Sequence, residues 1–521
     1  MTEHVRRGPD EQQASGHCQR MSSTPGTDPA GATHDEPART ADTGDDAYVP
    51  DPRRWKALGV CLIAGFMTLL DVSIVNVALP SIETGLGAGA NALQWIVSGY
   101  ALTLGLLLVP AGRLGDARGR RPAFMAGIAL FVVASAACGL APTTLVLVLA
   151  RLLQGFAGGL ITPQVSGLIQ NLFRGSERGK AFGWFGTTIG VSTAVGPLLG
   201  GAIIAVFGAD DGWRYVFFVN LPVGVVALVL ARRYIPHTPR PKGTQQDLDP
   251  LGVVLLGAAV LCLLLPFIEQ QTWHSPLRLL LFPLAAVLLV AWLLHERRYG
   301  RTREPVVNLE LFRLRSYPLG AALGMLYFAG FTGVFFTYTQ YLQDGLHYAA
   351  WQAGLAATPF ALGTALTAAL GSRAVTRLGR PLIAGGLVLV LVGLTASYVA
   401  VRLVPGHGVG WAVALPFLVA GLGSGLVISP NQTLTLSAVP VKRAGSAGGV
   451  LQTGQRIGSA AGIALTGSVF YGAVASSRGD FAVGFRHGLL VIGAFVLGAL
   501  VLALVDTFTS KAALTAKAGQ G

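Results

Sequence analysis

Three charged side chains lie deep within apolar stretches of the 521-residue sequence: Asp71, Arg151 and Arg456. In the hydrocarbon of a membrane, each would cost about 2.5–3.5 kcal/mol on insertion scales, so each needs a partner or a function. A conformational change that alters the distance between a buried carboxylate and a guanidinium would make the carboxylate take up or release a proton. We therefore expect proton chemistry at Asp71, with a static structural ion pair as the alternative.

The expected helices place Asp71 and Arg151 at similar depths. Asp71 precedes Pro80, at the outer end of its helix, by nine residues, which is roughly 13 Å at 1.5 Å per residue. Arg151 lies roughly 12 Å into a helix that runs the opposite way. The two side chains could therefore pair directly or through water, beside Gln154 one turn further on.

The remaining residues that could do chemistry offer no enzyme site. Every other carboxylate after residue 50 falls in a connection or at the end of an expected helix. The cysteines include no close pair, so a disulfide or metal framework is not indicated. No Gly-Lys-Ser/Thr loop that would hold a phosphate is present. We expect no enzyme, no cofactor and no metal.

The composition indicates an integral membrane protein. Hydrophobic residues make up 52% of the chain and charged residues only 12%, about half the charged share of soluble proteins. The net charge of +13 comes from bases clustered between apolar runs, as in membrane loops, so nucleic-acid binding is not expected.

Segments long enough to cross a bilayer as helix need about 20 apolar residues. About fourteen follow a six, two, six pattern: 56–79, 92–112, 123–141, 143–171, 179–207, 213–233; 250–268, 277–295; 317–342, 351–373, 382–401, 411–436, 444–472 and 484–507. The predicted divisions are a disordered cytoplasmic tail (1–50), a six-helix bundle (51–235), two linker helices (236–300), a second six-helix bundle (301–508) and a cytoplasmic tail (509–521).

Arginine and lysine gather in alternate connections. By the positive-inside rule these connections are cytoplasmic, which places both termini in the cytoplasm of a multi-pass protein of the cell inner membrane. The stretch 155–164 is also echoed by 421–431. Duplicated halves of this kind are typical of secondary transporters, whose substrate site lies between the halves.

Four motifs resemble the major facilitator superfamily and, within it, the fourteen-helix drug:proton antiporters. Residues 70–80 (LDVSIVNVALP) look like the helix 1 signature, and 147–155 (LVLARLLQG) like the helix 4 motif. The resemblance implies the major facilitator fold and a role in proton coupling for Asp71, Arg151 and Gln154. It covers residues 56 to 507.

The loop at 112–121 (GRLGDARGRR) is similar to the superfamily's loop between helices 2 and 3, with Ala117 where Arg is common. Asp116 can bond neighbouring helix termini, while Arg120 and Arg121 face acidic partners or lipid heads. We expect a latch of the outward-facing state. Charges that only set topology are the alternative. The residues of the expected latch are Gly112, Asp116, Gly119, Arg120 and Arg121.

Residues 190–201 (GVSTAVGPLLGG) resemble the motif associated with antiporters rather than symporters. Glycines permit close helix approach and proline bends a helix, so generic membrane packing is the alternative. The motif residues are Gly190, Gly196, Pro197, Gly200 and Gly201.

Substrate contacts are harder to predict, because a single aromatic residue can equally face lipid or pack inside. Taken together, the polar and aromatic candidates named below suit a large, amphipathic ligand. Relatives that export divalent cations tend to carry additional membrane acids, which this chain lacks, so we expect neutral, monocationic or weakly anionic lipophilic compounds. The candidates are Asn76, Trp95, Tyr100, Phe335, Tyr338, Gln340, Asn431, Gln452, Gln455 and Arg456.

Together these features predict a monomeric, proton-driven exporter of lipophilic drugs, antibiotics or secondary metabolites that works by alternating access. Its partners would be protons, a small lipophilic substrate and membrane lipid. A proton-coupled importer of a nutrient, or a lipid flippase, is the alternative.

Overall fold

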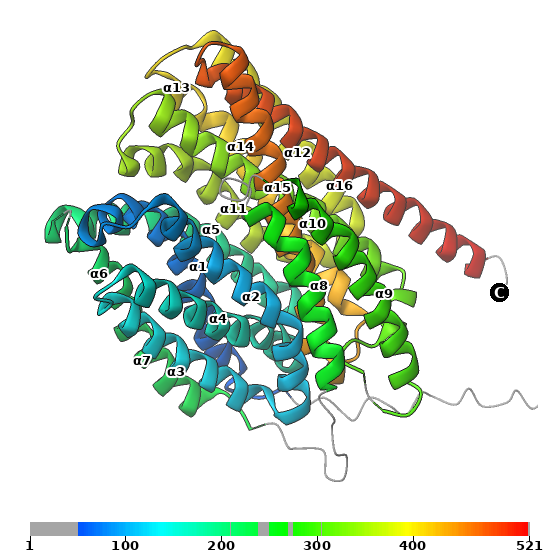
Figure 1. The fold of residues 1–521 in the computed structure, drawn as a ribbon. Coiled ribbons are helices and arrows are strands. Elements are labelled where there is room, and N and C mark those ends of the chain that lie inside the picture. The colour runs from blue at the N-terminus through cyan, green and yellow to red at the C-terminus, as the bar shows by residue number, and fades with distance from the viewer. Residues whose placement is uncertain (1–49, 209, 238–248, 269–274, 304, 519–521) are drawn as a thin grey trace, which may run out of the picture. The chain divides into compact units, whose positions relative to one another are not determined.

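The computed structural model describes residues 50–208, 210–237, 249–268, 275–303 and 305–518. The tail expected over 1–50 therefore lies outside the described residues, apart from Pro50. Within the described ranges, fourteen helices are long and apolar enough to cross a membrane. The expected all-α architecture with a six, two, six order of spans is confirmed (Figure 1).

The first six spans use seven helices. They are α1 (Arg54–Leu86), α2 (Ala90–Arg118), α3 (Arg120–Gly139), α4 (Thr144–Leu172), α5 (Gly175–Phe207), and α6 (Gly212–Phe218) with α7 (Asn220–Tyr234). The sharp turn from α2 to α3 is made at Gly119, whose φ of 101° favours a residue without a side chain.

The sixth span is broken, whereas the sequence predicted one helix over 213–233. Pro222 has no N–H to donate to the carbonyl of Phe218, four residues earlier. Helix α6 ends at Phe218, and α7 starts at Asn220. The break places the polar Asn220 at the start of a new helix, in the interior of the bundle.

Two helices follow the first six spans, α8 (Pro250–Ile268) and α9 (Leu281–Tyr299), the latter after a short 3-10 turn (Pro276–Leu280). Helix α8 packs against α2 and α15 as well as α9. Leu256, Val260 and Leu264 of α8 form one buried cluster with Leu102 and Val109 of α2. Helix α8 therefore covers the line along which α2 meets α15.

The last six spans begin with α10 (Ser316–Gln340), which ends in a π-helical turn (Tyr341–Gly345). They continue with α11 (Ala350–Leu378), α12 (Arg380–Leu403), α13 (Val409–Ala412) with α14 (Ala414–Ser437), α15 (Ala444–Ser476) and α16 (Phe481–Ala518). Helix α16 runs past residue 507, where the sequence predicted its end. Asp506, expected at a helix end, lies within it and pairs with Arg380 at 2.7 Å.

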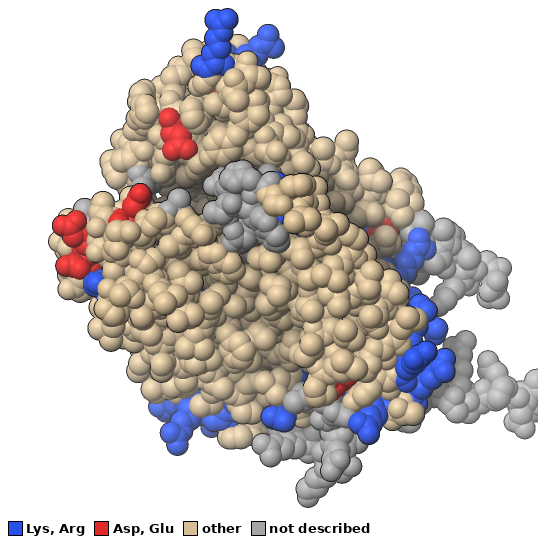
Figure 2. Space-filling model, viewed as in Figure 1, with Lys and Arg blue, Asp and Glu red and all other residues tan. Residues whose placement is uncertain are grey.

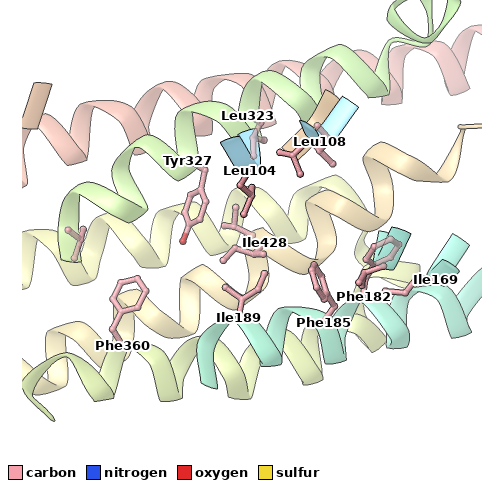
Figure 3. Packing of buried hydrophobic residues seen from close by; sticks show 14 of the residues in the cluster. Leu104, Leu108, Ile169, Phe182, Phe185, Ile189, Leu323, Tyr327, Phe360 and Ile428 are labelled. Atoms are coloured by element: carbon pink, nitrogen blue, oxygen red, sulfur yellow. The ribbon is translucent and has the colours of Figure 1, made fainter. Parts of the chain in front are cut away.

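The first and last groups of helices meet mainly where α5 packs on α11 and α2 on α15. Apolar side chains fill part of this junction: Phe185 and Ile189 of α5 lie near Ile428 of α14, and Leu104 of α2 near Leu323 of α10 (Figure 3). Large apolar side chains also face outward, as Leu145 (68% exposed) and Val206 (75%) do, which suits a surface in contact with lipid.

In Figure 2 most Lys and Arg lie along the lower margin and lower right side of the molecule, a few Lys and Arg lie at the top, Asp and Glu lie mainly at the upper left, and the broad surface between is uncharged. We call this side the basic end. The connections that the sequence predicts to be cytoplasmic lie at this end. They include the α2–α3 turn with Arg118 and Arg121, and the end of α7 with Arg232 (Figure 1).

Candidate functional site

Asp71 of α1 and Arg151 of α4 form a direct ion pair. Nη1 of Arg151 lies 2.5 Å from Oδ2 of Asp71. The side chain of Arg151 is 1% exposed and that of Asp71 is 0% exposed. The matched depths expected from the sequence are realised as contact without an intervening group. A charge pair this enclosed is stable only when its remaining hydrogen-bonding atoms are satisfied as well.

Three uncharged polar residues, Ser135, Gln154 and Asn220, form the remaining hydrogen bonds around the ion pair. Gln154 Nε2 donates to Asp71 Oδ1 at 2.8 Å, and Asn220 Nδ2 donates to the same oxygen at 3.0 Å. Both amides also donate to Ser135 Oγ, at 2.6 and 3.0 Å. Gln154 Oε1 accepts from Arg151 at 2.7 Å. We call Asp71, Ser135, Arg151, Gln154 and Asn220 the Asp71 network.

Helix α2 closes the network from one side. Arg151 Nε donates to the carbonyl of Ile96 at 2.9 Å, and the guanidinium stacks over the ring of Tyr100 with its carbon 4.3 Å from the ring centre. The Tyr100 hydroxyl donates to the carbonyl of Thr68 in α1. Stacking on an aromatic face stabilises an arginine away from water. Tyr100, a substrate candidate from the sequence, is buried and forms one wall of the network.

Ser135 and Asn220 were missed by the sequence reasoning, which surveyed charged residues within the spans. The signal that could have found them is weaker. Each is a hydrogen-bonding side chain in an apolar span, and Asn220 directly precedes the Leu-Pro step that breaks its helix.

Replacing Asn220 with alanine should destabilise the protein by about 1–3 kcal/mol, the cost of leaving buried polar groups without a partner. Thermal unfolding in detergent would measure this, with the exposed Asn91→Ala as the matched control. The loss should shrink when Asp71 is already asparagine, because the two side chains share a hydrogen bond. Additive losses would mean that Asn220 acts by packing alone.

At the basic end, Asp116 links α2 to α15. Its Oδ1 accepts from the backbone N–H of Gly445 at 3.0 Å and its Oδ2 from that of Ser446 at 2.8 Å. These donors belong to the first turn of α15, where a carboxylate is favoured by unpaired N–H groups and the helix dipole. Gly112, one turn earlier in α2, packs directly on the Gly445 backbone.

Arg120 is buried in this contact, with Nη2 2.8 Å from Asp116 Oδ1. It also donates to the carbonyls of Val441, at 2.7 Å, and Gly167. Arg121 departs from the expectation of an acidic or lipid partner. It donates to the carbonyl of Arg232 at 2.6 Å and contacts His237, because α7 ends beside the start of α3.

The glycine motif of α5 lets this helix pack closely on both sides. A Cβ at Gly200 would lie 2.9 Å from Ile74 of α1, and Gly196 abuts Ser73 of the same helix. A Cβ at Gly190 would lie 2.9 Å from the Ala361 carbonyl of α11, while Gly201 faces Trp351 and Pro197 faces Gly354. The motif therefore positions α5 between α1 and α11.

Three of the candidate substrate residues cluster in the interior. Asn431 of α14 donates to the carbonyl of Gly320 at 2.9 Å. Gln455 of α15 lies beside Gly324, as Asn431 does. Gln452 donates to Ser166 of α4 at 2.9 Å, across the two groups of helices.

Other candidates lie elsewhere. Tyr338 is buried, and its ring packs against Phe417 and Phe485. Phe335 packs on Phe331 and Phe360. A further group is partly buried or exposed and is not joined to the interior cluster: Gln340 bonds Asp344 and Tyr471, Asn76 bonds the carbonyl of Val72, and Trp95 packs near α8.

Arg456 is the remaining deep charge. Its side chain is neither exposed nor fully buried, and among the described residues it has no hydrogen bond or ion pair. The described residues likewise hold no group of three or more His, Cys, Asp or Glu that could bind a metal ion.

A family model, the Major Facilitator Superfamily, matches residues 61–463. Curated relatives include a probable actinorhodin transporter of Streptomyces coelicolor, 35% identical over 82% of this chain and 74% of its own. The puromycin resistance protein pur8 of Streptomyces alboniger is 35% identical over 90% of this chain and 95% of its own. The tetracenomycin C resistance and export protein of Streptomyces glaucescens is 34% identical, covering 86% and 80%.

Two solved structures share the fold. The human organic anion transporter MFSD10 superposes with a TM-score of 0.64 at 15% identity, covering 87% of this chain and all of its own. The proton:xylose symporter XylE gives 0.62 at 15% identity, covering 86% and 94%. With the family match and the relatives above, the chain is a multi-pass membrane transporter of the major facilitator superfamily, in its fourteen-helix antibiotic and multidrug efflux group.

Proposed function

We propose that this transporter is a proton-coupled antiporter that exports lipophilic drugs, antibiotics or secondary metabolites from the cytoplasm. The observation that carries the proposal is the direct, fully buried pair of Asp71 and Arg151. Neutralising the carboxylate would weaken its hold on Arg151, Gln154 and Asn220 together, since each donates to it. Binding of one proton would then loosen three helices, α1, α4 and α7, that the ionised carboxylate ties together.

The proposed orientation places the basic end in the cytoplasm, as the positive-inside rule predicts. In this structure α2 and α15 are joined at that end by Asp116 and by the contact of Gly112 with Gly445. The conformation is then closed to the cytoplasm, and opening it requires Asp116 to leave the first turn of α15. The loop motif thus acts as a latch of the outward-facing state.

The membrane potential can drive such an exchange. One charge crossing 100 mV supplies about 2.3 kcal/mol, which supports a roughly 50-fold concentration gradient at 1.4 kcal/mol per tenfold. The names of the relatives favour antibiotics as cargo. Among the described residues no second deep carboxylate lies near Asp71, which disfavours dications.

Uptake into inside-out membrane vesicles tests the proposal. A panel of lipophilic dyes and antibiotics, including puromycin, would be offered with and without a respiratory substrate. We expect energy-dependent uptake that an uncoupler abolishes. Uptake that the uncoupler leaves unchanged would contradict proton coupling, and substrate movement out of the same vesicles would favour the importer.

A further inference from the structure

Arg456 lies inside a membrane span and has no hydrogen bond or ion pair with any residue that the structure describes. It lies twelve residues after the start of α15, about 18 Å along the helix axis. The other deep arginine, Arg151, has a carboxylate at 2.5 Å. An unpaired charge at such depth is a functional site by default.

The position of Arg456 on α15 places it at the junction between the two groups of helices. Gly445, Gly449 and Arg456 are spaced by four and seven residues, so they share one face of α15. Gly445 meets Gly112 of α2 and Gly449 meets Leu108. The next position up α2 is Gly105, where a Cβ would lie 4.0 Å from the Cβ of Arg456.

Between this level and the basic end, glycines let the backbones of α2 and α15 touch. At Gly105, the long cationic side chain of Arg456 starts from the same face of α15. The absence of a side chain at Gly105 leaves that position to Arg456 and Leu264. Gln452, one turn below, has a buried Oε1 without a hydrogen-bond partner among the described residues. The guanidinium of Arg456 and the Oε1 of Gln452 could therefore both form hydrogen bonds with a ligand near this part of α15.

Tyr100 connects this level with the Asp71 network. Arg151 stacks on its ring at 4.3 Å, and five residues further along α2 is Gly105, whose Cβ position lies 4.0 Å from the Cβ of Arg456. An anion bound at Arg456 would therefore lie beside α2, the helix that also closes the Asp71 network. Binding at Arg456 could thus act on the Asp71–Arg151 pair through α2, whose Tyr100 stacks on Arg151.

We propose that Arg456 binds the anionic group, a carboxylate or phenolate, of an acidic lipophilic substrate. The inference rests on the proposed export function and names the class of substrate that this arginine selects. A guanidinium pairs with a planar anion through two parallel hydrogen bonds, which gives both affinity and orientation. Neutral compounds would need no such partner and would depend on Arg456 little.

A matched pair of probes tests the inference: a lipophilic fluorescent dye with a single carboxylate, and its methyl ester. Both would be offered to energised inside-out vesicles carrying wild type, Arg456→Gln, Arg456→Lys or Arg402→Gln. The last variant removes an exposed arginine at the end of α12. We expect Arg456→Gln to lower the uptake rate of the acid by about tenfold or more and that of the ester by less than about twofold.

Arg456→Lys should restore part of the acid's rate, because the charge is kept and only the fork geometry is lost. Uptake of the ester shows that each variant is folded and inserted. Equal losses for acid and ester, or a wild type that takes up the ester alone, would overturn the role of Arg456 and leave the export function standing. A wild type that takes up neither probe, although it takes up other compounds of the panel, overturns the role of Arg456; a wild type that takes up no compound at all overturns both proposals.

The electrical response gives a second readout. Whatever the proton stoichiometry, carrying the acid moves one negative charge more than carrying the ester. An interior-positive potential imposed on the vesicles should therefore accelerate uptake of the acid more steeply than uptake of the ester. Equal responses would mean that the acid crosses only in its protonated form, which contradicts anion binding at Arg456.

Discussion

Asp71→Asn should abolish energy-driven uptake of every substrate while leaving exchange of substrate between the two sides measurable. Asparagine keeps the size of the side chain and can still accept from Gln154 or Asn220, but it cannot take up or release a proton. Uptake driven by an imposed pH gradient should fall to the uncoupled background. Counterflow, in which a preloaded unlabelled substrate drives entry of labelled substrate without a proton gradient, measures the exchange that remains.

The control for this experiment is Asp211→Asn, which removes an exposed carboxylate at the start of α6. It should transport as wild type does. Asp71→Asn leaves Arg151 without its counter-ion, and breaking a buried pair typically costs about 3–5 kcal/mol. The double variant Asp71→Asn, Arg151→Gln should recover part of that stability without recovering transport. Full pH-driven uptake by Asp71→Asn would refute the coupling role.

The sequence was sufficient to predict the two charged members of the network, because a charge within an apolar span is conspicuous and its depth follows from helix geometry. Ser135 and Asn220 could not be singled out in the same way. Uncharged polar residues are common in membrane helices, and only the tertiary packing of α7 on α1 and α3 brings these two within 3.0 Å of their partners.

Helix boundaries illustrate the same limit. The span over 213–233 was predicted as one helix although Pro222 marks its break, since the apolar run continues through the proline. The end of α16 was placed at residue 507 because hydrophobicity falls there. The helix continues because backbone hydrogen bonding does not need lipid, and Asp506 is held inside it by Arg380 of another helix.

The contact of Arg120 with Asp116 shows what loop motifs can and cannot tell. The motif predicted that Asp116 would meet helix termini, and it does so at α15, some 330 residues further along the chain. Which helix it meets depends on the packing of the two groups of helices, and a single sequence holds no record of that. Arg121, at the start of α3, donates to a backbone carbonyl of α7, another helix of its own half.

Gly112→Leu should trap the transporter with its basic end open and stop transport. A Cβ at this position would lie 2.7 Å from the carbonyl carbon of Gly445 and 3.0 Å from the nitrogen of Ser446. Both are backbone atoms that cannot rotate away, so α2 and α15 could not close on a leucine. The conformation open at the basic end, in which these helices separate, would carry no such clash and would become the resting state.

Accessibility of a cysteine placed at Ser166, in contact with Gln452 across the junction, measures the effect. A membrane-impermeant thiol reagent added to inside-out vesicles should label it readily in Gly112→Leu and slowly in the parent. Gly385→Leu is the matched control, because Gly385 lies near the basic end of α12 with nothing within 4 Å of its Cβ position. Normal transport in Gly112→Leu would mean that α2 and α15 need not touch, and the latch at Asp116 would then have no part in alternating access.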